Sequence, residues 1–167
     1  VITASHNPKE YNGYKAYWND GAQVVAPHDK NIIAEVQKIT SPDQVLTNGH
    51  KDNIVILDET FDAIYLDAVH SLSLSPEAIA AHHDLKIVYT PIHGTGVILV
   101  PESLRKFGFT NVVTVKEQNI PDGNFPTVAS PNPEERATMK MAIDLAARQQ
   151  AEIVLATDPD ADRIGMA

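Results

Sequence analysis

The sequence has no cysteine among its 167 residues. It therefore forms no disulfide bond and no cysteine-ligated zinc site, and its composition fits a reducing compartment such as the cytoplasm. No apolar run approaches the roughly 20 residues that a membrane-spanning helix requires, and no secretory signal is recognisable. These absences predict a cytoplasmic protein with no membrane partner.

Basic residues are also scarce. The chain has 13 lysines and arginines against 22 aspartates and glutamates, which gives a formal net charge of −9. Such a chain is poorly suited to nonspecific binding of nucleic acid, so no nucleic-acid partner is expected. Its hydrophobic content of 43% and charged content of 21% are those of an ordinary globular protein. A phosphorylated substrate can still bind where a few cations gather.

An acidic run near the C-terminus is the clearest chemical feature. Asp158, Asp160 and Asp162 directly follow the apolar stretch 153–157, which predicts a strand. Three carboxylates this close repel one another unless a cation lies among them. Hard divalent ions such as Mg²⁺ favour oxygen ligands, so the run predicts a magnesium site at the end of a strand.

Three other interpretations of the acidic run are open at this point. An EF-hand calcium loop needs glycine at its sixth position and a preceding helix, whereas here the sixth residue is Arg163 and a strand precedes. A haloacid-dehalogenase phosphotransferase also places two spaced aspartates after a strand, but it normally has Thr or Val where this chain has Asp162. The third interpretation is a solvated acidic turn without function.

A polar segment at the other end of the chain, residues 3–8, contains Ser5 and His6. It fits a plain turn in which Ser or Asn side chains bond to the local backbone. It also fits a nucleophile or a covalent phosphate carrier, because a serine hydroxyl becomes reactive when a base, metal or cation activates it. His6 and Lys15 are close enough in sequence to supply that activation.

Strand-like and helix-like segments alternate along most of the chain. Helical patterns cover residues 27–39, 61–72, 94–107 and about 134–150, and strand patterns cover 85–89, 112–115 and 153–157. The alternation predicts an α/β fold with an at least partly parallel sheet, whose ligands gather beyond the carboxyl ends of the strands. The loops 91–96 and 158–163 are expected there.

A polar, turn-rich segment at residues 41–53 predicts a linker. We therefore expect one unit over residues 1–53 and a second over residues 54–167. The chain begins at Val1 rather than methionine and ends just past the acidic run, so we expect it to be a piece of a longer protein.

Four segments together resemble the α-D-phosphohexomutases, the family that includes phosphoglucomutase and phosphomannomutase. They are Thr3–Lys15, Thr90–Gly96, Asp122–Pro126 with Pro131–Glu134, and Asp158–Arg163. They occur in the family's order and span the whole chain. The resemblance implies three-layer α/β/α domains with mixed, largely parallel sheets: the C-terminal part of the family's first domain and most of its second.

The resemblance also implies a phosphorylated serine and a metal site. Ser5 is the residue that carries the phosphate. One Mg²⁺ per active site is expected to be bound by Asp158, Asp160 and Asp162, together with an oxygen of phosphorylated Ser5.

Further roles follow from the same resemblance. Lys15 and His6 are the other expected catalytic residues, through proton transfer and through contact with the phosphate. Arg163, Asn7 and His93 are expected to bind phosphate or substrate. The glycines after His93 form an anion-friendly backbone turn, although they fit a tight strand-to-helix connection equally well.

By this resemblance, the protein is an isomerase that interconverts hexose 1-phosphate and hexose 6-phosphate through a sugar 1,6-bisphosphate intermediate. The stretch 11–23 looks most like bacterial phosphoglucomutases, so glucose is the expected sugar, with phosphomannomutase and phosphopentomutase as alternatives. A non-catalytic interaction module that retains the loops is a more distant alternative. Family members have four domains around one cleft, so the missing domains are expected partners and this chain alone is expected to be inactive.

Overall fold

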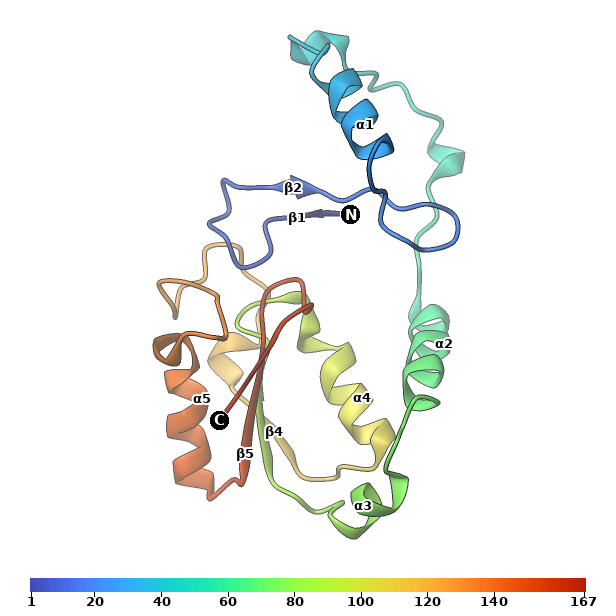
Figure 1. Ribbon diagram of the computed structural model, residues 1–167. Helices are drawn as coiled ribbons and strands as arrows, with labels where there is room; N and C mark the ends of the chain where they lie inside the picture. Colours follow the sequence, from blue (N-terminus) through green and yellow to red (C-terminus); the bar gives the residue numbers. More distant parts are fainter. The chain divides into compact units, whose positions relative to one another are not determined.

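The computed structural model describes residues 1–167, which form two compact units (Figure 1). The first unit comprises Val1–Thr3 and Gly13–Asp58, and the second comprises Ala4–Asn12 and Glu59–Ala167. The loop Ala4–Asn12 thus belongs to the second unit, although the strands on both sides of it belong to the first. The predicted boundary between residues 53 and 54 stays a prediction.

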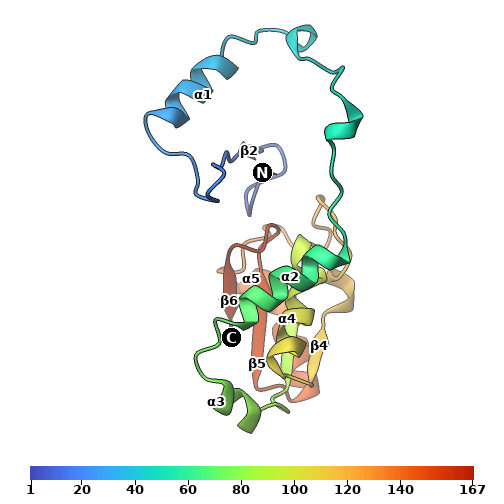
Figure 2. The same ribbon diagram turned by 90° about the vertical axis from the view of Figure 1, so that its right-hand side faces the viewer.

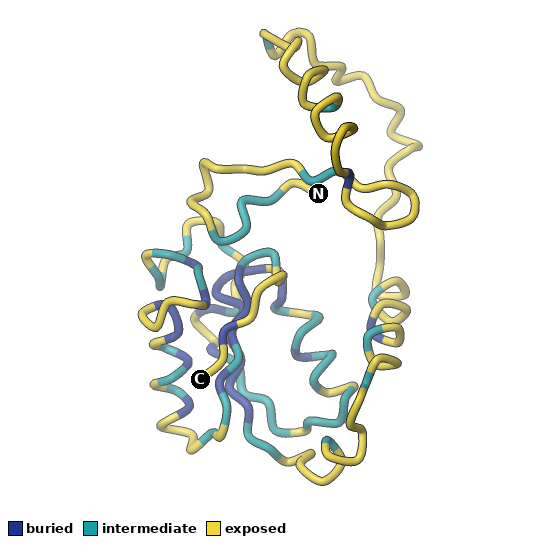
Figure 3. Tube along the Cα trace, viewed as in Figure 1, coloured by how far each residue is buried: buried dark blue, intermediate teal, exposed yellow.

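The first unit contains little regular structure. Strands β1 (Ile2–Thr3) and β2 (Gly13–Tyr14) pair in antiparallel fashion, followed by helix α1 (His28–Val36) and two short 3₁₀ turns, Pro42–Gln44 and Lys51–Asn53. Between β2 and α1, Tyr17 and Gln23 form an isolated antiparallel bridge. Most of this unit is exposed (Figure 3), and Val24 is its one buried apolar side chain.

A four-stranded sheet forms the centre of the second unit. Its strands are β3 (Ile87–Thr90), β4 (Val112–Thr114), β5 (Ile153–Thr157) and β6 (Ile164–Met166), arranged in the order β4-β3-β5-β6. The pairs β3–β4 and β3–β5 are parallel, whereas β6 runs antiparallel to β5. Because β3 lies inside the sheet, all four of its residues are buried, as expected for a strand covered on both faces.

Helices cover both faces of this sheet. Helix α5 (Arg136–Gln149) lies on one face, and α4 (Leu99–Phe107) lies on the other with α2 (Glu59–His70) packed against it (Figures 1 and 2). The short helix α3 (Pro76–Ala81) leads into β3. The expected α/β/α fold with a mixed, largely parallel sheet is confirmed. None of the helices is long and apolar enough to cross a membrane.

The core of the second unit lies between α5 and the sheet. Small side chains on α5, Ala142 and Ala146, let the helix approach Val88 of β3 and Val154 of β5 closely. Met139 fills the remaining space at the N-terminal end of the helix. The strands pair in parallel with Tyr89 opposite both Thr114 and Leu155, so the carboxyl ends of β3, β4 and β5 lie at the same edge of the sheet.

The C-terminal end of α4 and the N-terminal end of α5 differ in how they are capped. Helix α4 ends at Phe107, and Gly108, with a φ of 110°, provides a left-handed C-cap. Helix α5 begins at Arg136, and no side chain caps its N-terminus. Instead, the Asn132 side chain accepts a hydrogen bond from the backbone N–H of Glu134, because the turn Asn132–Glu134 closes on itself before the helix begins.

A buried hydrogen bond joins β3 to β5 close to their carboxyl ends. The Tyr89 hydroxyl lies 2.8 Å from Thr157 Oγ1, and Tyr89 is completely buried. Gly96 fits against this pair because it has no side chain, since a Cβ there would collide with both hydroxyls. Burial raises the pKa of Tyr89 to about 12, from an ordinary value of 10.0.

The raised pKa predicts an alkaline loss of stability that depends on Tyr89. The folded state favours the neutral phenol, so this contribution is complete below pH 10 and disappears as the pH rises towards 12. We expect Tyr89→Phe to cost about 1 kcal/mol at pH 8, because Thr157 loses its partner. Urea titrations followed by circular dichroism measure the free energy of unfolding of both proteins. Between pH 10 and pH 12, the wild type should lose up to about 2–3 kcal/mol more of this free energy than Tyr89→Phe does. Parallel pH curves for the two proteins would contradict this.

Candidate active site

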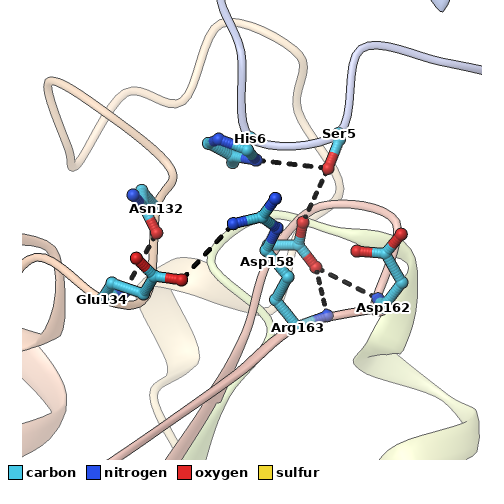
Figure 4. A network of polar contacts seen from close by, with 7 residues as sticks. All are labelled: Ser5, His6, Asn132, Glu134, Asp158, Asp162 and Arg163. Carbon is cyan, nitrogen blue, oxygen red and sulfur yellow. Dashed lines mark hydrogen bonds and ion pairs between the residues drawn. The ribbon is translucent and has the colours of Figure 1, made fainter.

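The acidic loop begins where β5 ends, at Asp158. This carboxylate is completely buried. Its Oδ1 accepts hydrogen bonds from the backbone N–H groups of Asp162, at 3.1 Å, and of Arg163, at 3.0 Å (Figure 4). The loop is therefore wrapped around Asp158, and β6 can start directly after Arg163.

Asp158, Asp160 and Asp162 converge as the sequence predicts. Each offers one carboxylate oxygen, and these oxygens all lie within 4.8 Å of one another. Burial raises the pKa of Asp158, and the neighbouring Asp160 carboxyl raises it further, while hydrogen bonds from the Arg163 backbone and the Ser5 hydroxyl act in the opposite direction. Three carboxylates this close, with Asp158 buried, Asp160 half-buried and Asp162 exposed, fit a hard divalent cation, because such a cation offsets the desolvation of Asp158 and the repulsion among the three.

The loop that follows β3, residues 91–96, contacts the acidic loop, residues 158–163. The backbone N–H of Thr95 and its hydroxyl both donate to the carbonyl oxygen of Pro159, at 2.9 and 3.0 Å. Gly94 abuts the backbone of Pro159 so closely that a Cβ at this position would collide with it. At the first position of the turn 94–96, a residue without a side chain is therefore required for steric reasons.

Ser5 lies against the acidic loop. Its hydroxyl donates to Asp158 Oδ2 at 3.0 Å, across 153 positions of sequence, and lies 3.3 Å from His6 Nδ1 (Figure 4). Ser5 has a φ of 53°, an uncommon value for a residue with a side chain, and it sits in the turn where the Asn7 N–H bonds to the Ala4 carbonyl. The serine thus has one acceptor from the acidic triad and one imidazole beside it.

Arg163 supplies a cation at the same site. Its Nη1 lies 3.3 Å from Glu134 Oε1, and its guanidinium lies between Glu134 and the Ser5–His6 pair (Figure 4). The segment carrying Glu134 is packed directly on β6, since the Pro133 carbonyl leaves no room for a Cβ on Gly165. Glu134 was not among the expected site residues. The Asn-Pro-Glu turn was the available signal, but it was interpreted as the start of a helix.

Three further expected site residues have the following contacts in the structure. Asn7 is exposed and forms the serine turn through its backbone. Lys15 belongs to the first unit, where its backbone N–H bonds to the Val1 carbonyl. His93 is 4% exposed, and its ring nitrogens lie 2.9 Å from the Ile120 carbonyl and from Thr127 Oγ1. Both polar atoms of this ring are therefore occupied by the protein itself.

Two models of protein families match the chain. Phosphoglucomutase/phosphomannomutase, alpha/beta/alpha domain II, matches residues 63–167, and the model of domain I from the same family matches residues 1–43. The chain belongs to the phosphoglucomutase/phosphomannomutase family. This result agrees with the sequence resemblance.

Proteins related in sequence to this member of the phosphoglucomutase/phosphomannomutase family are longer than the chain itself. A Haemophilus influenzae protein called "Probable phosphomannomutase" is 42% identical over 171 aligned positions, which cover 100% of this chain and 34% of that protein. A phosphoglucomutase of Staphylococcus saprophyticus is 38% identical over 170 aligned positions, which cover 99% of this chain and 30% of that protein. The chain therefore spans about a third of the length of these curated relatives.

One solved structure of a related protein has the same fold as this chain. It is a phosphoglucomutase/phosphomannomutase family protein from Burkholderia thailandensis, with a TM-score of 0.71 and 23% sequence identity. The match covers 100% of this chain and 32% of that one. At this level of identity, the likeness concerns the fold.

Proposed function

We propose that the natural protein is a phosphohexomutase, an isomerase that interconverts hexose 1-phosphate and hexose 6-phosphate, with glucose as the sugar. The observation that carries the proposal is the hydrogen bond from the Ser5 hydroxyl to Asp158, within a cluster of three carboxylates. A phosphate-carrying serine next to a magnesium site accounts for this arrangement. Membership of the phosphoglucomutase/phosphomannomutase family supports it.

The three aspartates and an oxygen of Ser5 would hold one Mg²⁺ in this proposal. When bound, Mg²⁺ neutralises phosphate charge and acts as a Lewis acid. The donor set supports this assignment, because hard oxygen ligands and three neighbouring carboxylates suit a small divalent ion.

The proposed step at Ser5 is a phosphoryl exchange with the sugar. A phosphorus–oxygen bond of the sugar 1,6-bisphosphate breaks, a bond from phosphorus to Ser5 Oγ forms, the Ser5 proton leaves and the sugar oxygen gains a proton. The reverse step phosphorylates the other hydroxyl of a hexose monophosphate. Catalysis of such a transfer rests mostly on positioning and charge neutralisation.

Side chains around Ser5 divide this work in the proposal. Asp158 orients the hydroxyl, and His6, 3.3 Å from Ser5 Oγ, borders the transferred phosphate. Arg163 supplies positive charge beside the phosphate. Lys15 is proposed for proton transfer and Asn7 for phosphate binding. For His93 we propose a supporting role, because its ring is buried and hydrogen-bonded at both nitrogens.

The proposed enzyme needs more chain than the 167 residues described. We propose that residues 1–53 and 54–167 are parts of the first and second family domains, and that further domains bind the sugar hydroxyls and the distal phosphate. The greater length of the relatives supports this. The chain alone is expected to show no turnover.

Mannose is the second candidate sugar, because a relative with 42% identity is named a phosphomannomutase. A substrate panel on the full-length protein tests the choice, with glucose, mannose, glucosamine and pentose 1-phosphates compared by kcat/KM in Mg²⁺ and a trace of sugar bisphosphate. We expect glucose 1-phosphate to be preferred by at least about 10-fold, which is about 1.4 kcal/mol of discrimination in the transition state. A preference for mannose or pentose phosphate would reject glucose, and no turnover of any would reject the mutase.

A further inference from the structure

Glu134 was not expected in the candidate site, yet its side chain pairs with Arg163. Arg163 Nη1 donates to Glu134 Oε1 at 3.3 Å. The two side chains are partly exposed, Glu134 at 66% and Arg163 at 43%. An ion pair this exposed stabilises a folded protein very little, so the pair matters through where it holds the guanidinium.

The backbone of Glu134 is fixed to the sheet. Pro133, directly before it, is fully buried, and its carbonyl packs against Gly165 of β6, where a Cβ would collide with it. The Glu134 N–H donates to Asn132 Oδ1 at 3.0 Å, and the Glu135 N–H donates to the Asn132 carbonyl at 3.1 Å. The Glu134 carboxylate is thus carried by a turn that is held on both sides.

The backbone of Arg163 is fixed as well. Its N–H donates to Asp158 Oδ1 at 3.0 Å, and its carbonyl accepts from the Asp158 N–H at 3.4 Å. Gly165 lies two positions further along the chain, so the packing of Pro133 on β6 also brings Glu134 next to Arg163. Folding therefore sets both ends of the ion pair before any ligand binds.

The Arg163 guanidinium has competing acceptors in the acidic loop. The carboxylates of Asp158, Asp160 and Asp162 lie at the same site, and they attract a guanidinium that is free to turn. A long arginine side chain also has many rotamers, and ordering them costs free energy. In Figure 4, Glu134 and the Asp162 carboxylate lie on opposite sides of Arg163. Glu134 therefore draws the guanidinium away from the aspartates that the cation needs.

We propose that Glu134 is a positioning residue, which holds the Arg163 guanidinium beside Ser5 so that its other N–H groups meet the phosphate carried there. The proposal rests on the phosphoserine of the proposed function. Glu134 acts through Arg163, since its side chain contacts the guanidinium and the guanidinium lies between Glu134 and the Ser5–His6 pair (Figure 4).

The chemistry of the groups allows Arg163 and a cation to share one phosphate. A guanidinium has five N–H donors in a rigid plane, and the contact with Glu134 is made through Nη1. A phosphate on Ser5 has three terminal oxygens, so one can be shared with the cation while another accepts from Arg163. Because Glu134 is largely exposed, water screens its own repulsion of the phosphate.

Nuclear magnetic resonance of the full-length protein tests the positioning without requiring activity. The order parameter of the Arg163 Nε–H group, assigned by the loss of its signal in Arg163→Met, reports how firmly the guanidinium is held. We expect a value above about 0.6 in the wild type and below it in Glu134→Ala, since lower values indicate flexible groups. A mobile guanidinium in the wild type, or equal order in the two proteins, would overturn the proposal.

Two further variants sharpen this experiment. Glu134→Gln keeps an acceptor oxygen at the same distance from the backbone and should retain most of the order of Arg163. Glu135→Ala removes the same charge one residue further on, where the carboxylate accepts from Ser130 Oγ at 2.9 Å. It should leave both the order of Arg163 and the rate of phosphoryl transfer unchanged.

Single-turnover transfer separates positioning from a general loss of stability. With Ser5 phosphorylated beforehand, transfer to a hexose monophosphate should slow about 5-fold in Glu134→Ala, in the rate at saturating sugar rather than in the half-saturating sugar concentration. In the Arg163→Met background, Glu134→Ala should have no further effect, because the group that it positions is absent.

The outcomes of the transfer experiment distinguish this proposal from the proposed function. Unchanged or faster transfer in Glu134→Ala, or an equal loss with and without Arg163, would reject the positioning role alone. If the protein accepts no phosphate at all, the proposed function fails, and the order parameter still decides whether Glu134 fixes Arg163.

Discussion

The Ser5→Ala variant of the full-length protein is expected to lose mutase turnover by on the order of 10⁴-fold or more, because it has no oxygen that can receive the phosphoryl group. Its melting temperature should change little, since Ser5 is only partly buried and forms its bonds at a loop. Steady-state kinetics with hexose 1-phosphate measure the loss. Intact-mass spectrometry after incubation with a sugar bisphosphate should show one added phosphate on the wild type and none on the variant.

A matched control for this experiment is Ser71→Ala. The Ser71 hydroxyl bonds to the Ala68 carbonyl at the end of α2, where it is exposed. This variant should keep both its phosphate and its turnover. A phosphate retained by Ser5→Ala would show that another residue is the carrier. A wild-type protein without phosphate under every substrate condition would favour the non-catalytic interaction module.

The Asp160→Asn variant is expected to bind Mg²⁺ more than about 100-fold more weakly. Loss of a residue that merely supports a metal ligand already costs about 10- to 100-fold, and this substitution removes one of three converging charges. Calorimetric titration of the full-length protein with MgCl₂ measures the affinity directly. Activity should fall in parallel, and higher Mg²⁺ concentrations should restore part of it.

Asp144→Asn is the corresponding control, because Asp144 pairs with Lys140 on the exposed side of α5. Its Mg²⁺ affinity should equal that of the wild type. An Asp160→Asn protein with unchanged affinity would remove Asp160 from the metal site. If neither the wild type nor the Asp144→Asn variant bound Mg²⁺, the cation assignment for the whole acidic loop would be rejected.

The sequence predicted the layers of the second unit well because burial leaves a clear pattern there. Strands such as β3 and β5 are runs of apolar residues between turn signals, and α5 has apolar side chains at helical spacing. Strand β6 was not predicted. It has three residues, two of them exposed, and its pairing with β5 depends on the acidic loop reversing the chain.

The candidate site was harder to predict in its details. Three aspartates at alternate positions gave their own signal, and the structure brings them together. No local pattern could have placed Ser5 beside Asp158, because 153 positions separate them and the contact arises from tertiary folding. The family resemblance supplied that expectation. Whether Ser5 and its neighbours act as proposed stays a prediction.

His93 illustrates the opposite case. The family resemblance implied that His93 binds phosphate or substrate, whereas the Gly-Thr-Gly sequence alone fitted an anion-binding turn and a tight strand-to-helix connection equally well. In the structure, Ile92 and His93 both have positive φ values, 48° and 60°, and the ring is buried among Gln118, Thr127 and Ile120. Positive φ in non-glycine residues depends on surrounding contacts, and a single sequence does not reveal it.

The two oxygens of Asp158 have separate partners, and this has a consequence for how the site responds to charge. Oδ1 is held by two backbone N–H groups, so the carboxylate cannot rotate and Oδ2 points in one fixed direction. A group oriented by folding needs little rearrangement when a ligand arrives, and the energy of reorganisation is spent before the reaction starts. Glutamate would carry the same charge on a longer, freer side chain. At position 158, the fixed orientation of the carboxylate therefore matters to the proposed chemistry as much as its charge does.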